Sequence, residues 1–326
     1  MKVLLTGATG FVGSHILDAL CLQEIEVVAL LRPTSNRQFI ARRLERVEVR
    51  IGALDDPASL RQALRDVSHV IHCAGLTKAL NRAGFIAGNR LGTRHVIEAI
   101  NAQGAVQRLV HISSLAVGGP APPERPARED DPPRPVSVYG ESKLGGEDEV
   151  KRGCQAPYVI VRPAAVYGPR DDGFFSLFQA VKRRVIPRFM GSLAALSMIY
   201  AKDLAAAVVV CLTHPAATQR TYYAASPEVL RGEAFAREIA RQMNVRAVTL
   251  PLPAPLVWSA CVVQEGISQL RRRPQILGLQ KYRELRAPGW VCDSSRLREE
   301  LGYVAGTPHA EGIAETLAWY RQEGWL

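Results

Sequence analysis

Short apolar runs alternate with helix-like stretches along the first half of the chain. The runs that predict β-strands lie at 2–7, 26–31, 47–52, 69–75, 108–114 and 158–163. The residues between them follow helical spacing and predict helices at 11–23, 57–66, 84–103 and 137–151. Strands that are apolar almost throughout suit a parallel sheet covered on both faces. The pattern therefore predicts an α/β fold with a doubly wound parallel sheet, whose ligand lies beyond the carboxyl ends of the strands.

The alternation becomes less regular after Gly168. Helical stretches dominate there, at about 231–243, 254–271, 294–302 and 309–322, and the strand signals beside them are weak. We therefore expect one domain over 1–168, to which 197–215 returns, and a smaller, mostly C-terminal substrate lobe made of 169–196 and 216–326. Seven prolines between Pro120 and Pro135 predict an irregular loop bordering the site.

The composition narrows the class of protein without choosing a ligand. With 47% hydrophobic and 22% charged residues among 326, the chain can bury a large core, which excludes wholesale disorder. The 41 Lys and Arg exceed the 31 Asp and Glu, which favours a phosphate-bearing ligand, nucleic acid or an anionic membrane surface. The six scattered cysteines, the lack of a signal-peptide core and the lack of a membrane-spanning run predict a reduced, cytoplasmic protein.

A glycine-rich turn follows the first predicted strand. The segment TGATGFVG places Gly7, Gly10 and Gly13 between that strand and the first helix. Glycines there permit a tight turn, let backbone N–H groups approach a pyrophosphate and allow close packing of the helix on the strand. Many strand–helix turns need glycine for structural reasons alone, but the position in the first strand–helix unit favours a dinucleotide. The turn therefore predicts a Rossmann domain that binds NAD(P).

The end of the second predicted strand bears on which dinucleotide is bound. An NAD site places a carboxylate there for the ribose 2′-hydroxyl, and Leu31 cannot serve. Arg32 can instead pair with a 2′-phosphate, with Ser35 and Arg37 close enough to help. The alternative is that Arg32 is an ordinary surface arginine. We expect NADP(H) to be preferred, with NAD(H) as the second choice.

Two residues of the segment YGESK are candidates for proton transfer. Tyr139 and Lys143 lie four apart, so they share one face of the predicted helix. A nearby ammonium stabilises a phenolate and lowers the phenol pKa from about 10, which makes the tyrosine a usable acid or base. The pattern is common, and a solvated pair is the alternative. Ser114, at the end of a predicted parallel strand, adds a hydroxyl that could hydrogen-bond a substrate oxygen.

Taken together, these motifs resemble the extended short-chain dehydrogenase/reductase family, within the NAD-dependent epimerase/dehydratase superfamily. The match is closest to its 3β-hydroxysteroid dehydrogenase and dihydroflavonol reductase-like branch. The matching motifs span about residues 1–210: TGATGFVG, HCAG, NRLGT (89–93), ISSLAVGG (112–119), YGESK, RPAAVYGP (162–169) and MIYAKDLAAA (198–207).

The resemblance implies a role for each catalytic candidate. Tyr139 is the expected acid/base, Lys143 its pKa-lowering partner and Ser114 the hydroxyl that polarises the carbonyl, with Asn89 supporting the proton relay. Ala53 stands where many members have an aspartate for adenine, so Leu54 and Asp55 are expected to substitute. The expected cofactor contacts are Gly7, Thr9, Gly10, Phe11, Val12, Gly13, Arg32, Ser35, Arg37, Leu54, Asp55, Cys73, Ala74, Gly75, Tyr139, Lys143, Pro163 and Val166.

Departures from the sugar-modifying members favour a simple redox enzyme. Leu115 and Ala116 follow Ser114 where sugar dehydratases carry carboxylates, and Ala165 precedes VYGP where many sugar-nucleotide enzymes have asparagine. We expect an NADP(H)-dependent oxidoreductase that interconverts a hydroxyl and a carbonyl on a small-molecule substrate, which could be bulky, apolar and steroid- or lipid-like. One alternative is a UDP-sugar 4-epimerase with bound NAD. Another is a non-catalytic NADP-binding sensor or scaffold.

The remaining expectations concern partners. The basic runs lack interleaved aromatic residues, so we expect no nucleic acid. The stretch 254–271 with Arg271–Arg273 could rest on an anionic membrane, although Gln264, Glu265 and Gln269 interrupt its apolar face; we expect no stable insertion. The family commonly forms homodimers through the helices around 84–103 and 137–152, which we expect here. No metal is expected, because the histidines lack ligand spacing: His69 and His72, for example, point to opposite faces of a strand.

Overall fold

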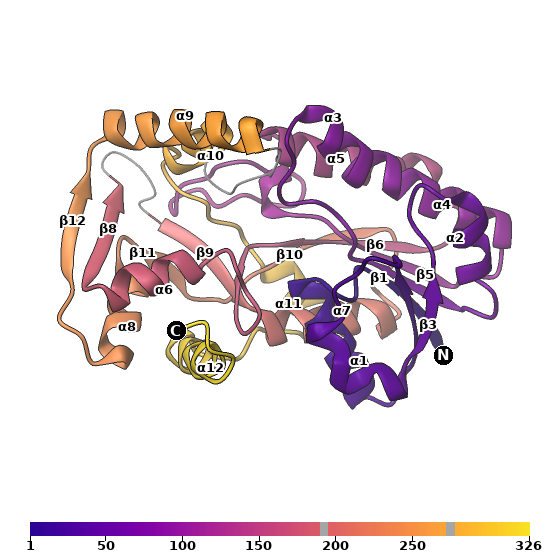
Figure 1. Cartoon of the computed structure of the whole chain (residues 1–326). Helices are drawn as coiled ribbons and strands as arrows, with labels where there is room; N and C mark the ends of the chain where they lie inside the picture. The colour runs from indigo at the N-terminus through magenta and orange to yellow at the C-terminus, as the bar shows by residue number, and fades with distance from the viewer. Residues whose placement is uncertain (190–194, 272–277) are drawn as a thin grey trace.

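The computed structural model describes residues 1–189, 195–271 and 278–326, and its centre is a parallel sheet. The strand order is β10-β6-β5-β4-β1-β2-β3, and every neighbouring pair is parallel (Figure 1). The strands are β1 (Lys2–Thr6), β2 (Glu26–Leu31), β3 (Glu48–Ile51), β4 (His69–His72), β5 (Arg108–Ile112), β6 (Tyr158–Pro163) and β10 (Arg220–Ala224). The sheet confirms the predicted doubly wound fold.

Helices cover both faces of this sheet. The helices on one face are α1 (Phe11–Leu22), α7 (Ala201–Thr213) and α11 (Ser295–Leu301), and those on the other are α2 (Pro57–Ala63), α4 (Gly92–Gln103) and α5 (Val138–Gly153). Successive residues of a strand point to opposite faces, so Leu5 joins the first buried cluster while Leu4 joins the second. Apolar side chains on both faces explain why the strands are apolar almost throughout.

Irregular segments complete this half of the molecule. The helix expected over 84–103 consists of α3 (Arg82–Phe85), a π-helical turn (η2, Ile86–Leu91) and α4. A 3-10 segment (η1, Gln38–Arg46) follows β2, and another (η3, Leu115–Val117) follows β5. The expected proline-rich loop is attached to the C-terminal part of the chain by bridges from Ala121 to Trp290 and from Ala127 to Cys292.

The lobe has small sheets of its own. One has the order β11 (Val229–Arg231), β9 (Ala195–Tyr200), β7 (Ala165–Tyr167), and the other pairs β12 (Val248–Leu252) with β8 (Val185–Phe189). An aromatic core that includes Tyr167, Phe178, Phe235 and Tyr320 joins α6 (Phe175–Lys182), α8 (Ala234–Met243) and α12 (His309–Gln322). Helices α9 (Ala254–Arg271) and α10 (Leu279–Leu285) lie along the top of the lobe in Figure 1.

The strands of the second half are the main departure from the sequence expectation. All four helices expected there are present, as α8, α9, α11 and α12, but the short strands between them were not anticipated. Arg220–Ala224, expected in the lobe, forms the edge of the central sheet beside β6. A five-residue strand that pairs only with distant segments leaves little local pattern, which is why the return to the sheet extends beyond 197–215.

Candidate functional site

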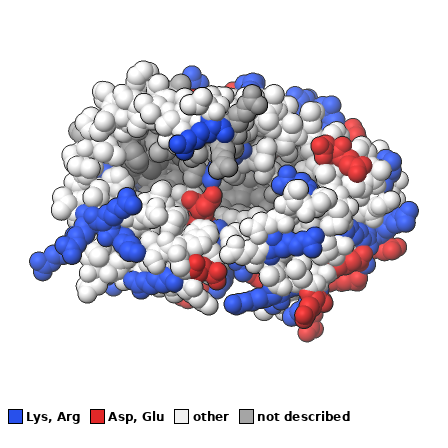
Figure 2. Space-filling view, viewed as in Figure 1, with Lys and Arg blue, Asp and Glu red and all other residues white. Residues whose placement is uncertain are grey.

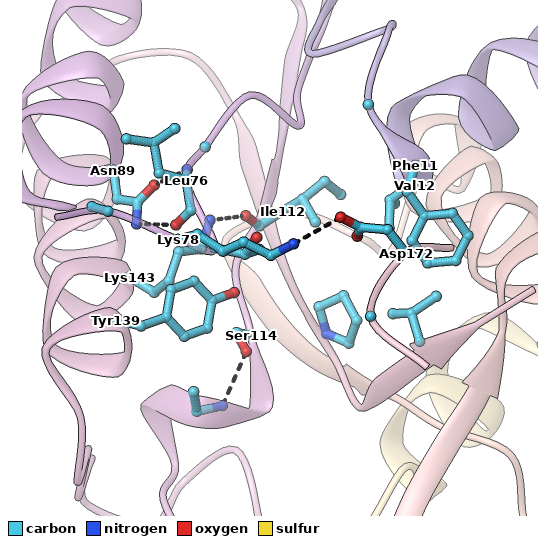
Figure 3. Close-up of a pocket in the computed structure, with 18 of the residues that line it drawn as sticks. Phe11, Val12, Leu76, Lys78, Asn89, Ile112, Ser114, Tyr139, Lys143 and Asp172 are labelled. Carbon is cyan, nitrogen blue, oxygen red and sulfur yellow. Dashed lines mark hydrogen bonds and ion pairs between the residues drawn. The ribbon is translucent and has the colours of Figure 1, made fainter. Parts of the chain in front are cut away.

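A cleft of about 1960 Å³ runs along the carboxyl ends of the central strands and continues into the lobe. Figure 2 shows it as a hollow in the middle of the molecule, and Figure 3 shows part of its lining. Of the expected cofactor and catalytic residues, all but Arg37 line it. The structure therefore brings residues from position 6 to position 166 together in one continuous site.

The glycine turn forms one wall of the cleft. Gly7 has φ +78, and a Cβ atom there would lie 2.6 Å from the backbone N of Ala74. A Cβ atom on Gly13 would collide with the carbonyl oxygen of Gly7. Helix α1 begins after Gly10 without a side-chain cap, so its first N–H groups remain available beside the cleft. Backbone this compact, with free N–H groups at a helix N-terminus, fits a pyrophosphate.

The end of β2 carries the cation expected from the sequence. Arg32 is exposed and lines the cleft together with Ser35, whose Oγ accepts a hydrogen bond from the Arg32 backbone N at 3.0 Å. Arg37 is exposed and lies at the start of η1, outside the cleft lining, because the chain turns away after Ser35. The structure thus does not bring Arg37 into the cleft with Arg32 and Ser35. Leu54 and Asp55 follow β3 and line the same end of the cleft.

Three polar side chains meet where the cofactor end of the cleft joins the lobe. In Figure 3 the Tyr139 ring lies between Lys143 and Ser114. Lys143, buried on α5, donates a hydrogen bond from Nζ to the Ile112 carbonyl oxygen at 2.5 Å, and burial lowers its pKa to about 8. The Oγ of Ser114 accepts a hydrogen bond from the Ala116 backbone N at 3.1 Å, and its hydroxyl is also hydrogen-bonded with Tyr139.

The electrostatics of Tyr139 differ from the expectation. Burial raises its pKa, and a hydrogen bond with Ser114 opposes that shift. The lowering effect expected from Lys143 is absent, because the ammonium is directed at the Ile112 carbonyl. The phenol is therefore protonated at neutral pH. In this state it can donate a proton, which suits reduction of a carbonyl.

Asn89 holds this cluster together from behind. Its Oδ1 accepts from the Leu76 backbone N at 2.6 Å, and its Nδ2 donates to the Leu76 carbonyl at 2.9 Å and to Ser142 Oγ at 2.8 Å. Ser142 in turn donates to the Tyr139 carbonyl oxygen at 2.7 Å. Asn89 thus ties the loop after β4 to the first turn of α5, and it acts on Tyr139 through Ser142.

A buried ion pair below the site was not anticipated from the sequence. Glu147, one turn after Lys143, has a side chain with 0% exposure and pairs with Arg162, which has 2%, at 2.7 Å. Ser113 donates to Glu147 Oε1 at 2.6 Å. Burial opposes ionisation of Glu147, but Arg162 outweighs it and holds the carboxyl pKa below its usual range. The sequence signal for this pair is Arg162, a charged residue in the otherwise apolar strand β6.

A second unexpected ion pair crosses the mouth of the cleft. Lys78, in the loop after β4, contacts Asp172 at 2.7 Å, and Figure 3 shows the two side chains meeting from opposite sides. Beside it, Asp171 accepts from the backbone N of Gly173 at 2.7 Å and of Phe174 at 3.1 Å. Burial raises the pKa of Asp171 to about 6. These contacts fix the loop that separates the cofactor end of the cleft from the lobe.

The lobe end of the cleft is mostly apolar. The apolar side chains that line it are Phe174, Leu177, Pro187, Leu196, Met198, Leu230, Phe235, Leu285 and Trp290. Phe178 lies in the lobe core and Trp258 is exposed, so neither contributes to the cleft. Among the described residues, no group of three or more His, Cys, Asp or Glu could hold a metal, and no described helix could span a membrane. Cys73 lines the cleft, and burial raises its thiol pKa to about 12.

The parallel sheet, the glycine turn and the Ser–Tyr–Lys cluster define an NAD(P)-dependent enzyme with a Rossmann domain. The sequence pattern of the NAD dependent epimerase/dehydratase family matches residues 3–225, and this chain belongs to that family.

Relatives that match over nearly the whole chain include a lipid reductase and a sugar-nucleotide epimerase. A ceramide reductase from Caulobacter vibrioides is 33% identical over 99% of this chain and 96% of its own. A UDP-glucose 4-epimerase from Vibrio cholerae is 25% identical over 97% of this chain and 94% of its own. The solved UDP-glucose 4-epimerase of Thermus thermophilus, a complex with NAD, shares the fold with a TM-score of 0.78 and 23% identity, over 98% of this chain and 99% of that one.

Proposed function

We propose that this enzyme is an NADP(H)-dependent reductase that converts a ketone on a lipid-like substrate into a hydroxyl. The observation that carries the proposal is the apolar lining of the cleft beyond Tyr139 and Ser114. Such a mostly apolar lining favours an alkyl chain over a sugar nucleotide, for whose hydroxyl and phosphate groups it offers few polar partners. The 33% identity with a ceramide reductase supports the same substrate class.

The chain's own residues divide the chemistry among them. Ser114 donates a hydrogen bond to the substrate carbonyl oxygen, and Tyr139, protonated at neutral pH, donates the proton that turns this oxygen into a hydroxyl. Lys143, with a pKa of about 8, supplies the proton that restores the phenol from the resulting phenolate. When bound, the nicotinamide cofactor supplies the hydride for the carbonyl carbon. Asn89 and the Glu147–Arg162 pair position these groups.

The preference for NADP(H) rests on Arg32. Its guanidinium is exposed at the end of β2, with the Ser35 hydroxyl beside it, and β2 ends in Leu31 and Arg32 with no carboxylate. A guanidinium can bind a 2′-phosphate through two hydrogen bonds, whereas a carboxylate there would repel it. The glycine turn accommodates either dinucleotide.

A second candidate is a UDP-sugar 4-epimerase. The relative from Vibrio cholerae favours it, and the same Ser–Tyr–Lys cluster could serve. An epimerase has to turn the sugar over within the cleft and to hold a uridine diphosphate at its lobe end. The described lining there offers Arg188 as a cation, and it is paired with Glu233 at 3.7 Å.

One experiment separates the two candidates. The full-length protein is incubated with NADPH and a ceramide that carries a ketone, and separately with UDP-glucose, and the products are identified by mass spectrometry and chromatography. The reductase reading predicts a product two mass units heavier than the keto-lipid, formed with one equivalent of NADP⁺ and more slowly with NADH. Formation of UDP-galactose without added cofactor, and no reduction of the keto-lipid, would overturn it.

A further inference from the structure

Helix α9 turns its polar side inward and its apolar side outward. Along one face, Cys261 and Ser268 are buried and Gln264 and Glu265 line the cleft. On the outer side, large apolar side chains are exposed: Leu256, Val262, Val263 and Leu270, the last by 86%. Trp258, one turn after the start of α9, is also exposed, although it lies on the same side of the helix as Glu265. This arrangement is the reverse of an ordinary surface helix, which exposes its polar side. Gln264 and Glu265, which were expected to interrupt the apolar face of this helix, face the cleft instead.

The strand that precedes α9 also exposes apolar side chains. Val248 and Leu250 of β12, two residues apart and therefore on one side of the strand, are 72% and 50% exposed. We call the exposed apolar side chains of β12 and α9 (Val248, Leu250, Leu256, Trp258, Val262, Val263 and Leu270) the apolar flank. Several large exposed apolar side chains on two consecutive elements mark an interaction site, whereas scattered single ones do not.

Unpaired cations border this flank. Lys182, Arg183 and Arg184 precede β8, and Arg246 precedes Val248 on the neighbouring β12, where the Val248 backbone N donates to the Arg184 carbonyl at 2.9 Å. All four side chains are exposed, and within residues 1–189, 195–271 and 278–326 none forms an ion pair. Figure 2 shows basic side chains projecting at lower left, where β8 and β12 begin in Figure 1. Arg271 ends α9 at the other end of the flank; Arg272 and Arg273 lie outside the described residues.

The same helix separates the flank from the cleft. Gln264, Glu265 and Ser268 line the lobe end of the cleft, and Gln269 donates to the Leu80 carbonyl at 2.9 Å, which joins α9 to the loop beside the active site. An apolar surface bordered by cations matches a bilayer with anionic headgroups, in which tryptophan favours the interface. A second copy of this chain would bring the same cations together, which disfavours a symmetric contact at this surface.

We propose that the apolar flank rests on the surface of a membrane that contains anionic lipids, so that the cleft receives its substrate from the bilayer beside α9. The substrate route rests on the proposed function. The docking itself does not, and it is measured without turnover.

The test is sedimentation of the full-length protein with sucrose-loaded vesicles of phosphatidylcholine, with or without roughly 30% phosphatidylglycerol. The wild type is expected to sediment with the anionic vesicles, and added salt should weaken this binding. Replacing Leu256, Val263 and Leu270 with serine should lower the binding constant by at least about tenfold, because each side chain loses apolar contact with the bilayer. The matched control, Leu22→Ser with Ile51→Ser, changes apolar side chains that are 74% and 50% exposed elsewhere and should bind normally.

The cations are tested in the same way. Changing Lys182, Arg183 and Arg246 to glutamine should lower binding by about tenfold or more, while Arg61→Gln with Arg125→Gln should not. Wild-type protein that stays in the supernatant with anionic vesicles would overturn the proposal. So would a dimer in solution that the serine variant converts to a monomer, because the flank would then be covered by a second copy. If the wild type binds anionic vesicles but does not reduce the ketone, the proposed function is wrong and the membrane docking stands.

Discussion

The two ends of the cleft are made of different kinds of groups. At the cofactor end, backbone N–H groups of the glycine turn and a few hydrogen-bonded polar side chains form the wall, and most come from loops that directly follow central strands. At the lobe end the wall is mostly apolar, and it is assembled from segments spread between residues 174 and 290. The first end is defined by hydrogen-bond geometry and the second by packing.

This difference separates reaction from substrate choice. A change at the cofactor end removes a hydrogen bond or a charge that no neighbour can replace, so it should alter rate or cofactor preference. A change at the lobe end alters the shape of an apolar surface, so it should alter which substrate is accepted. Substitutions made separately at the two ends of the cleft test this division.

The largest effect is expected from Tyr139→Phe. Without the phenolic proton, kcat for ketone reduction should fall by about 10²–10⁴-fold, while NADPH affinity stays within a few-fold. Stopped-flow measurement of NADPH oxidation, together with calorimetric titration, gives both quantities. Tyr158→Phe removes a hydroxyl outside the cleft and should leave both unchanged. Near-normal turnover of the Tyr139 variant would remove the tyrosine from the mechanism.

The next-largest effect is expected on the free energy of unfolding, from the buried Glu147–Arg162 pair below the active site. Glu147→Gln leaves the buried Arg162 guanidinium without its counter-charge, so the free energy of unfolding should fall by about 3–5 kcal/mol. Chemical denaturation measures this. The control is Glu141→Gln, which breaks the exposed pair with Arg82 and should cost less than about 1 kcal/mol. Equal losses in the two variants would show that the buried pair gives no special support.

A smaller effect is expected from the arginine at the end of β2. Arg32→Ala should weaken NADPH binding by about tenfold or more, the loss typical of a charged hydrogen bond, and leave NADH binding unchanged. Arg37→Ala is the matched control, because Arg37 is also exposed but lies outside the cleft lining. Equal weakening of both cofactors by the Arg32 change would contradict a 2′-phosphate contact.

The smallest effect is a pH dependence. Lys143 has a lowered pKa of about 8, so it is protonated below that pH and loses its charge above it. Burial keeps the pKa of Tyr139 above its ordinary value near 10, so the phenol still carries its proton there. The rate constant kcat for reduction should therefore halve near pH 8 and continue to fall at higher pH. A flat profile between pH 6 and pH 9 would show that the Lys143 charge is not required.

The sequence predicts the two ends of the cleft unequally well. The first strands of the Rossmann sheet are apolar almost throughout and alternate with helical segments, so β1 and β2 are found within a residue or two, along with the glycine turn between β1 and α1. Tyr139, Lys143 and Ser114 were found because short motifs carry them. The direction of the Lys143 ammonium was missed, since it depends on the Ile112 carbonyl of another strand.

The lobe gave weaker signals for physical reasons. β7, β9 and β11 are three to six residues long and pair with one another across gaps in sequence, and β10 lies outside the expected return segment. The Glu147–Arg162 and Lys78–Asp172 pairs join residues 15 and 94 positions apart, and no local pattern announces them. The sequence shows that α9 carries apolar side chains, but not that Gln264 and Glu265 line the cleft while the large apolar residues are exposed.

The central claim is that the apolar lobe end of the cleft selects a lipid-like ketone. The most direct test is kcat/KM for NADPH-dependent reduction of a series of ketones that differ only in alkyl chain length. The account predicts that kcat/KM rises with each added methylene, by up to about fourfold per group while the chain is still entering the cleft. A kcat/KM that is independent of chain length, with turnover of UDP-glucose by the same preparation, would contradict it.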